Sequence, residues 1–148
     1  MTMTTPIDLI RLEGEGNSVV VRITGREPAE GASGVSEVLV GEVVVDTPFV
    51  RGALPTQVFP DDLTQWRETL DTLDGGDDAA WREEDGAPEL FIELDPDGER
   101  AHVTIADRTT SLTETTVTVT LTDAWFDDAY ERLDSTLRTW PLRGALHV

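Results

Sequence analysis

Carboxylates dominate the side chains of this sequence that could do chemistry. The 148 residues include 30 aspartates and glutamates, 2 histidines and no cysteine. The lack of cysteine excludes a disulfide framework, a thiolate nucleophile and a zinc ribbon. Acid–base chemistry with two carboxylates would require them to converge in a site that separates their pKa values. The sequence contains so many possible pairs of carboxylates that it singles out none of them as an acid and a base. We therefore predict no catalytic residues.

The two histidines lie far apart in the sequence. His147 is one residue from the C-terminus, where chains tend to fray. His102 lies in a predicted strand, so its side chain faces either solvent or a second layer. A Ser-His-Asp site would need His102 together with Ser36 or Ser111, and no nucleophile-elbow motif surrounds either serine. These features argue against an enzyme.

Cofactor and metal motifs are also absent. The stretch DPDGE at Asp95–Glu99 resembles the start of a calcium loop, but the twelfth position would be Ala106, which has no ligand oxygen in its side chain. A hairpin turn explains the stretch. The stretches GEGNS and GASG match neither nucleotide fingerprint. We therefore expect no cofactor and no metal.

A cluster of acids around one tryptophan is the candidate binding site. The six residues of this predicted partner-binding site are Asp77, Asp78, Trp81, Glu83, Glu84 and Asp85. Aromatic residues are favoured anchors at interfaces, and a carboxylate rim steers a basic partner. The alternative is that Trp81 plugs the end of a sheet and that the acids form a solvated loop.

The formal charge of the chain is −19. Residues 60–99 hold fifteen acidic residues and two arginines, a net charge of −13. Such a field disfavours nucleic acid and anionic lipid and attracts basic proteins. All 11 basic residues are arginine. A biased coding composition or adaptation to high salt would produce this pattern, so the acidity has an explanation other than binding.

Period-two patterns rich in valine, isoleucine and threonine predict about seven strands. They cover Ile7–Gly14, Ser18–Gly25, Ser36–Asp46, Phe49–Phe59, Glu89–Asp95, Arg100–Asp107 and Thr113–Thr122, with a short strand or loop at Ala79–Arg82. Hairpin-like turns between neighbouring runs favour antiparallel pairing.

Two segments change to the helical period of 3.6 residues. The apolar positions of the first are Leu63, Trp66, Leu70 and Leu73, and those of the second are Phe126, Ala129, Tyr130, Leu133, Leu137 and Trp140. The sequence therefore predicts an α+β fold, in which two amphipathic helices pack on a largely antiparallel sheet or sheets. We expect a single domain over residues 1–148, with loosely ordered tails at 1–6 and 142–148.

Six stretches carry a resemblance to known proteins, and they span residues 7–141. They are IDLIRLEG, SVVVRITG, GEVVVDTPFVRGALP, DDLTQWRETLDTL, AAWREEDGAPELFIEL and TVTLTDAWFDDAYERLDSTLRTWP. Together they resemble a family of small actinobacterial proteins of unknown function. The order of elements and apolar positions is more loosely similar to the WapI-type immunity proteins of polymorphic toxin systems. That resemblance implies binding and neutralisation of a toxin domain, and it carries over no catalytic residue.

These observations lead to a non-enzymatic acidic module that binds a basic protein, as an immunity protein does when it occludes a toxin domain. The alternative is a structural or accessory domain whose acidity reflects adaptation or coding bias. A third interpretation is an enzyme that uses carboxylates. The sequence shows no secretory signal and no apolar run of membrane-spanning length, so we expect a cytoplasmic protein. Its oligomeric state stays open.

Overall fold

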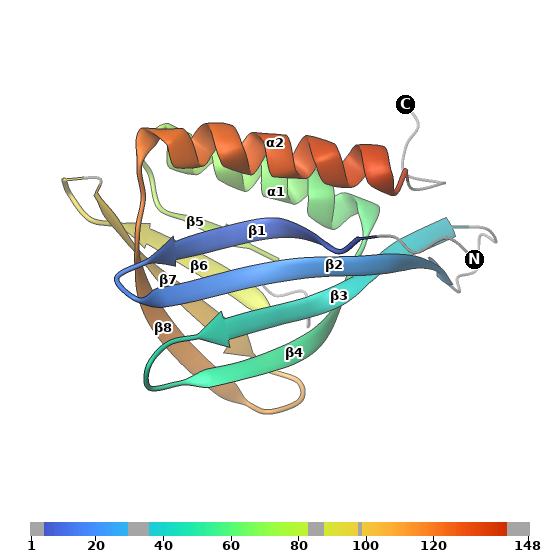
Figure 1. Cartoon of the computed structure of the whole chain (residues 1–148), viewed down its shortest axis with the longest axis horizontal. Helices are drawn as coiled ribbons and strands as arrows, with labels where there is room; N and C mark the ends of the chain where they lie inside the picture. Colours follow the sequence, from blue (N-terminus) through green and yellow to red (C-terminus); the bar gives the residue numbers. More distant parts are fainter. Residues whose placement is uncertain (1–4, 30–35, 83–87, 98, 142–148) are drawn as a thin grey trace.

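The computed structural model describes residues 5–29, 36–82, 88–97 and 99–141. These residues form eight strands and two helices, with the same order of four strands and a helix in each half of the chain (Figure 1). The first half holds β1 (Ile7–Gly14), β2 (Asn17–Ala29), β3 (Ser36–Asp46), β4 (Arg51–Val58) and α1 (Pro60–Asp74). The second half holds β5 (Ala79–Trp81), β6 (Glu89–Leu94), β7 (Arg100–Asp107), β8 (Thr113–Thr120) and α2 (Asp123–Thr139).

The predicted α+β fold is confirmed. Of the short strand or loop expected at Ala79–Arg82, the structure has the strand: β5, whose three residues pair with β6, is the eighth strand beside the seven that we predicted. A run of three residues is too short to show the alternation by which strands are recognised in a sequence. The other strands lie within a few residues of their predicted bounds.

The strands form two four-stranded antiparallel sheets. The strand orders are β1-β2-β3-β4 and β5-β6-β7-β8, so each strand pairs with its neighbours in the sequence. Figure 1 shows the two helices side by side along one side of the sheets, and α1 contacts β5 while α2 contacts β1. The helices thus cover the β1 and β5 edges of the two sheets, and neither of them lies over the β4 and β8 edges.

The β1–β2 turn joins the two sheets through a close approach to β8. Asn17 Nδ2 donates a hydrogen bond of 2.8 Å to the carbonyl oxygen of Thr118. Gly14 has a φ of +156°, and a Cβ atom there would lie 2.4 Å from the backbone nitrogen of Thr120. Only glycine fits this position, because any side chain would push the turn away from β8.

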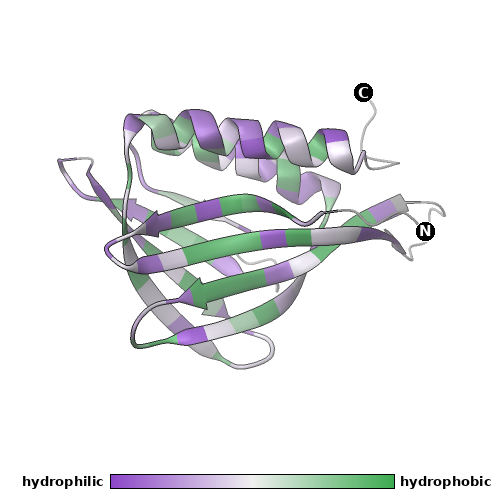
Figure 2. Cartoon of the chain, in the orientation of Figure 1, coloured by the Kyte–Doolittle hydropathy of each residue, from purple (hydrophilic) through white to green (hydrophobic). Residues whose placement is uncertain are grey.

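The core lies between the sheets and beneath the helices. Figure 2 shows long hydrophobic stretches on β2 and β3, and one cluster of buried residues includes side chains from both halves of the chain. The predicted face of α1 is buried in full. The predicted face of α2 is buried at Ala129, Leu133 and Trp140, whereas Leu137 is 38% exposed. The helical period of α2 was therefore predicted correctly, but fewer of its apolar side chains are buried than we expected.

Candidate functional site

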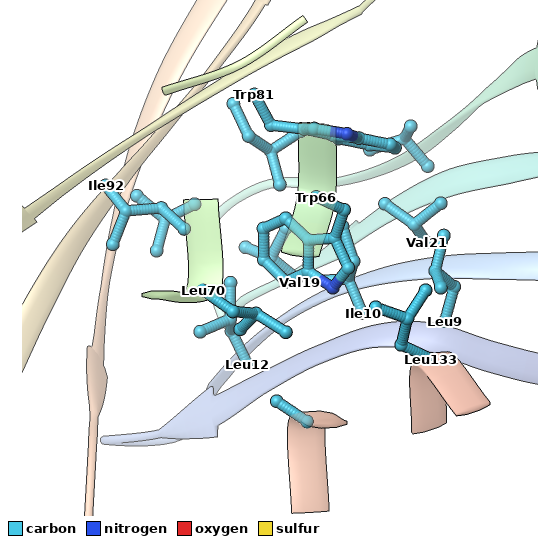
Figure 3. Packing of buried hydrophobic residues seen from close by; sticks show 14 of the residues in the cluster. Leu9, Ile10, Leu12, Val19, Val21, Trp66, Leu70, Trp81, Ile92 and Leu133 are labelled. Atoms are coloured by element: carbon cyan, nitrogen blue, oxygen red, sulfur yellow. The ribbon is translucent and has the colours of Figure 1, made fainter. Parts of the chain in front are cut away.

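Trp81 belongs to the core, so the predicted partner-binding site lacks the aromatic anchor that we expected. Its side chain is fully buried. Its ring packs edge to face against Trp66, with 5.7 Å between ring centroids, and Figure 3 shows both rings among the core residues of the sheets. The indole Nε1 donates a hydrogen bond of 2.8 Å to the carbonyl oxygen of Asp62. Trp81 is buried because β5 packs against α1, which contributes both Trp66 and Asp62.

The next residue, Arg82, is the unexpected member of this region. Its side chain is also fully buried, and its φ of 62° turns the chain sharply at the end of β5. The guanidinium carbon lies 4.1 Å from the centroid of the Trp81 ring. The carboxylate of Asp62 lies 3.9 Å from Nη1 and balances the buried charge.

The guanidinium of Arg82 binds backbone carbonyls on two other segments. Nε and Nη2 donate hydrogen bonds of 3.1 and 2.9 Å to the carbonyl oxygen of Pro88. Nη1 donates one of 2.9 Å to the carbonyl oxygen of Gln57 at the end of β4. The backbone N–H of Arg82 donates one of 2.7 Å to Oε1 of Gln65 in α1. One residue therefore joins β4, α1 and the start of β6.

These contacts fix the two ends of an acidic segment. Glu83, Glu84 and Asp85 lie outside the described residues, between Arg82 and Pro88. Both flanking residues are buried, and the Arg82 guanidinium bonds directly to the Pro88 carbonyl. The described residues on the two sides of the three acids are thus joined directly to each other by hydrogen bonds. We call residues 83–87 the acidic segment.

The other two acids of the predicted site lie at the opposite end of β5. Asp77 and Asp78 are exposed in the turn after α1. Asp78 Oδ1 accepts a hydrogen bond of 2.8 Å from the backbone N–H of Leu94, so this carboxylate holds the turn to β6. The three residues of β5 separate this turn from Arg82 by about 10 Å. Asp77 and Asp78 therefore lie at one end of β5 and Arg82 at the other, with the buried Trp81 between them.

Sequence reasoning missed Arg82, Gln57 and Pro88. The only signal for Arg82 is its place as one of two arginines in the acidic stretch of residues 60–99. Nothing in the sequence shows that its partners are backbone carbonyls of β4 and of the residue before β6, because those contacts arise only when the two sheets meet.

His102 forms a chain of side chains that resembles a catalytic relay. Its Nε2 lies 2.7 Å from Asp95 Oδ1, and its Nδ1 lies 3.0 Å from Thr118 Oγ1. Thr118 is the direct cross-strand partner of His102 in the β7–β8 register. Both bonds are therefore cross-strand and turn contacts that the fold itself explains. Ser111 bonds instead to Asp107, 2.7 Å from hydroxyl to carboxylate.

The Asp95–Glu99 stretch is a hairpin turn. The N–H of Asp95 donates to the carbonyl oxygen of Arg100 at 3.0 Å, and Asp97 Oδ1 accepts from the N–H of Glu99 at 2.9 Å. Within the described ranges, no three histidine, aspartate or glutamate side chains gather as a metal site would require. No helix in the same ranges is long and apolar enough to cross a membrane.

Asp107 and Tyr130, both outside the predicted site, have strongly displaced pKa values. Hydrogen bonds from Ser111, first from its hydroxyl and then from its N–H, together with the N–H groups of Thr110 and Thr109, lower the pKa of Asp107 to about 2. Burial and a hydrogen bond to Asp71 raise the pKa of Tyr130 to about 12. Both groups have structural partners: Asp107 organises the β7–β8 turn, and Tyr130 links α2 to α1 at 2.6 Å.

The architecture defines a class of small α+β proteins in which two four-stranded antiparallel sheets share one core with two helices. The chain belongs to the family of unknown function DUF5959, whose model matches residues 7–141. None of the curated proteins matches it. Among solved structures, it is similar to that of the plant transcriptional regulator PBF-2, with a TM-score of 0.54 and 11% sequence identity over 93% of this chain and 84% of that one. At this identity the likeness shows the fold alone.

Proposed function

We propose that this protein is a non-enzymatic binding module for a basic protein, and that the acidic segment is one of its contact surfaces. The observation that supports the proposal is the concentration of negative charge in residues 60–99, which includes the three consecutive carboxylates Glu83, Glu84 and Asp85. The described residues on either side of them, Arg82 and Pro88, are buried and are joined by hydrogen bonds of 3.1 and 2.9 Å.

Electrostatics supports a basic partner. The net charge of −19 and its concentration in residues 60–99 attract cations over long range. Complementary charges raise the rate of encounter and suppress wrong partners more than they raise affinity. Trp81 plays no direct part in binding, since it is in the core, and its role is to support Arg82. Asp77 and Asp78 form a separate exposed patch beyond β5.

The looser resemblance to WapI-type immunity proteins points to the biological role that this binding would have. An immunity protein neutralises a toxin by occluding it, which requires a binding surface and no catalytic group. We place the protein in the cytoplasm, where it would meet such a toxin. The charge also disfavours direct contact with nucleic acid, so we do not extend the role of the plant transcriptional regulator to this chain.

The competing proposal is an accessory domain whose acidity is adaptation or coding bias. The observation in its favour is the exclusive use of arginine among the 11 basic residues. This proposal predicts no basic partner, and it predicts a fold that gains stability when salt screens its self-repulsion.

Capture from the native cell lysate separates these proposals. We would immobilise the wild type, a variant with Glu83→Ser, Glu84→Ser and Asp85→Ser, and a matched variant with Glu27→Ser, Glu99→Ser and Asp127→Ser. The last three residues are exposed carboxylates on β2, on the β6–β7 turn and on α2. Both variants have the same net charge, and only one of them alters the acidic segment.

We expect a basic protein to bind the wild type and the matched variant at about 0.1 M salt and to be released at about 1 M. The variant of the acidic segment should capture markedly less of it. Equal capture by the two variants would show that only total charge matters and would refute the assignment of this segment. An empty eluate from the wild type would favour the accessory domain.

A further inference from the structure

Three of the four edge strands of the two sheets are protected against pairing with another strand. The edge strands are β1, β4, β5 and β8. Trp125 Nε1 of α2 donates a hydrogen bond of 2.7 Å to the carbonyl oxygen of Arg11 in β1. The hydroxyl of Thr69 in α1 donates one of 3.1 Å to the carbonyl oxygen of Ala80 in β5. Each helix therefore covers the edge strand that it contacts (Figure 1).

The edge of β4 is protected by a proline and by the buried Arg82. The hydrogen bond of 2.8 Å from the N–H of Thr47 to the carbonyl oxygen of Val50 closes the β3–β4 hairpin. Because hydrogen-bonded and non-hydrogen-bonded pairs alternate from there, the backbone groups that face away from β3 are those of Arg51, Ala53, Pro55 and Gln57. Pro55 has no N–H to offer an added strand, and the carbonyl oxygen of Gln57 already accepts a hydrogen bond from Arg82.

The backbone of β8 alternates in the same way. The N–H of Leu121 donates a hydrogen bond of 2.9 Å to the carbonyl oxygen of Glu99, on the side of β7. The carbonyl oxygen of Thr118 accepts one of 2.8 Å from Asn17 of the β1–β2 turn, on the opposite side. The even-numbered residues of β8 therefore direct their backbone N–H and C=O groups away from β7. The β1–β2 turn covers this edge at Thr118 and Thr120.

The first half of β8 has no such cover. Its even-numbered residues are Glu114 and Thr116, and both are exposed. Across residues 5–29, 36–82, 88–97 and 99–141, β8 pairs with β7 alone, and no hydrogen bond reaches the outward backbone groups of these two residues. The strand contains neither proline nor lysine, the residues with which proteins commonly protect an edge. An unprotected edge of this kind is a template for another strand.

This edge also belongs to a neutral part of a strongly acidic chain. Arg108 and Glu114 are the charged residues of segment 108–122, so its net charge is zero, whereas the whole chain carries −19. The two side chains lie 3.9 Å apart, and Arg108 also pairs with Glu89 at 3.0 Å. A basic partner therefore finds little to attract it here, and an acidic molecule meets little repulsion.

A hollow of about 190 Å³ lies beside the same half of β8, on the side of the sheets away from the helices (Figure 1). Thr113 and Thr115 line it from β8, and Val45 and Leu54 line it from β3 and β4. Leu112, directly before the strand, is 78% exposed, although its φ of 56° suits glycine better than leucine. A strand added to this edge would cover the leucine and place its own inner-face side chains over the hollow.

We propose that the first half of β8 is the interface at which two copies of this chain pair, strand against antiparallel strand. The β5–β8 sheets of the two copies would continue into each other around a twofold axis, the commonest symmetry of protein dimers. The occupant is a second copy because Glu114 already has Arg108 as its partner and because β8 is itself a threonine-rich strand within the neutral segment. Pairing here adds less repulsion than contact between more acidic surfaces would. The inference goes beyond the proposed function and does not depend on it.

The position of the axis follows from the free backbone groups. An axis at Glu114 would set two carboxylates opposite each other, which is unfavourable. An axis at Thr116 would pair Glu114 with Thr118, whose carbonyl oxygen already binds Asn17. An axis at Thr115 pairs Glu114 of each copy with Thr116 of the other, and these residues all direct free N–H and C=O groups to the partner. The two Thr115 residues would then face each other as a non-hydrogen-bonded pair, with about 4.5 Å between their Cα atoms.

Sedimentation equilibrium of the full chain between about 1 µM and 1 mM tests for this dimer. The dimer should tighten at least about fivefold between about 0.1 and 1 M sodium chloride, because salt screens the repulsion between two acidic molecules. Capture of a basic protein should weaken under the same change, so the two kinds of binding respond to salt in opposite directions.

A pair of variants at one position tests the strand pairing. Thr116→Pro removes an N–H that the proposed pairing uses, whereas Thr116→Ala removes the same hydroxyl and keeps the N–H. The proline variant should dimerise at least about tenfold more weakly than the wild type, because two intermolecular hydrogen bonds are lost per dimer. The alanine variant should dimerise within about twofold of the wild type.

A single introduced thiol reports the register, because the chain contains no cysteine. Thr115→Cys should give a disulfide-linked dimer under mild oxidation, since the expected Cα separation lies in the range of disulfides. The matched variant is Thr113→Cys, which lies on the same face of β8 and is more exposed. In the proposed register its two copies are about 13 Å apart along the strands, so it should cross-link at least about tenfold more slowly.

Amide hydrogen exchange of the wild type provides a test that needs no variant, which matters if thermal unfolding shows that Thr116→Pro does not fold. The amides of Glu114 and Thr116 should be protected at about 1 mM protein and exchange rapidly at about 1 µM. The amide of Ala53, on the edge of β4, should exchange at the same rate at both concentrations. Equal exchange of Glu114 and Thr116 at the two concentrations would contradict the pairing.

Other results would overturn the inference in distinguishable ways. A dimer that a folded Thr116→Pro variant leaves unchanged, or faster cross-linking through Thr113→Cys than through Thr115→Cys, would place the interface elsewhere. A dimer that dissociates in high salt would be held by ion pairs instead of by the neutral edge. A monomer at every concentration and salt would refute the inference and leave the proposed binding of a basic protein untouched.

Discussion

The side chain of Arg82 links segments of the chain that are far apart in the sequence. It is fully buried, it packs on Trp81, and it hydrogen-bonds to carbonyls of Gln57 and Pro88. A guanidinium carries five N–H donors in a rigid plane, which suits it to several carbonyls at once. Lysine could not replace it, because an ammonium cannot reach acceptors on two segments in this planar arrangement.

Replacing Arg82 with methionine should therefore destabilise the fold strongly. The change removes the donors and leaves the carbonyl groups of Pro88 and Gln57 and the carboxylate of Asp62 without this partner. We expect the free energy of unfolding to fall by about 3 kcal/mol, as measured by urea denaturation. The control is Arg51→Met, since the Arg51 side chain is 79% exposed and pairs with Asp46 at the surface. That change should cost less than about 1 kcal/mol, and equal losses in the two variants would contradict the role given to Arg82.

At the scale of elements, the β7–β8 turn is organised by a single carboxylate. Asp107 accepts hydrogen bonds from three consecutive N–H groups and from the hydroxyl of Ser111. This arrangement favours the charged form, which is why the pKa of Asp107 is lowered from 3.8 to about 2. The geometry of this turn, including the positive φ of Leu112 at its end, therefore depends on this ionised group.

The stability contribution of Asp107 should depend on pH. Because its pKa is lower in the folded state than in the unfolded state, the unfolded chain binds more protons in this range, and stability rises with pH. The contribution is fully present above about pH 4 and is lost as the pH falls toward 2. Denaturation of the wild type and of an Asp107→Ala variant from pH 7 to 3 measures this. The difference between their midpoints should be largest at neutral pH and should narrow below pH 4; a constant difference would contradict the assignment.

The elements themselves were largely predictable, and their contacts were not. Valine-rich alternation identified β2 and β3, and the spacing of Leu63, Trp66, Leu70 and Leu73 identified the buried face of α1. Trp81 could not be placed, because its neighbours Trp66 and Asp62 come from α1 and because β5 is too short to show a period. The separation of Asp78 from the acidic segment likewise required β5 to be recognised as a strand.

The surface hollow between β3–β4 and β7–β8 could not be predicted from the sequence. Its walls come from β3–β4 and β7–β8, which are far apart in the chain, so no local pattern reveals it. Phe49 looked like the start of a strand, and its exposure became apparent only when the structure placed it in a turn before β4. The acidic composition, by contrast, was visible at once, because charge is a property of the whole sequence.

At the scale of the whole molecule, the charge of −19 acts on the fold as well as on partners. Like charges on a compact surface repel one another and oppose folding, and salt screens this repulsion. The ion pairs of the described surface, such as that of Arg67 with Asp134 at 2.8 Å, offset only part of it. The protein should therefore be more stable in salt whether or not it also binds a basic partner.

Thermal unfolding between about 0.1 and 1 M sodium chloride tests this expectation. The midpoint of the wild type should rise with salt. The variant with Glu27→Ser, Glu99→Ser and Asp127→Ser should show a smaller rise, because fewer charges remain to be screened. A midpoint that is flat or falls with salt would show that the surface ion pairs outweigh the repulsion. A rise in stability without any salt-sensitive capture of a basic protein would favour the accessory domain.

The contacts of Arg82 with Trp81 and Pro88 have a consequence for how such a protein diversifies. The guanidinium lies 4.1 Å from the centroid of the Trp81 ring and donates to the Pro88 carbonyl, and neither contact involves a side chain of residues 83–87. Selection for a stable fold would therefore act on Trp81, Arg82 and Pro88, whereas selection for a particular partner would act on the three acids that lie between Arg82 and Pro88 in the sequence.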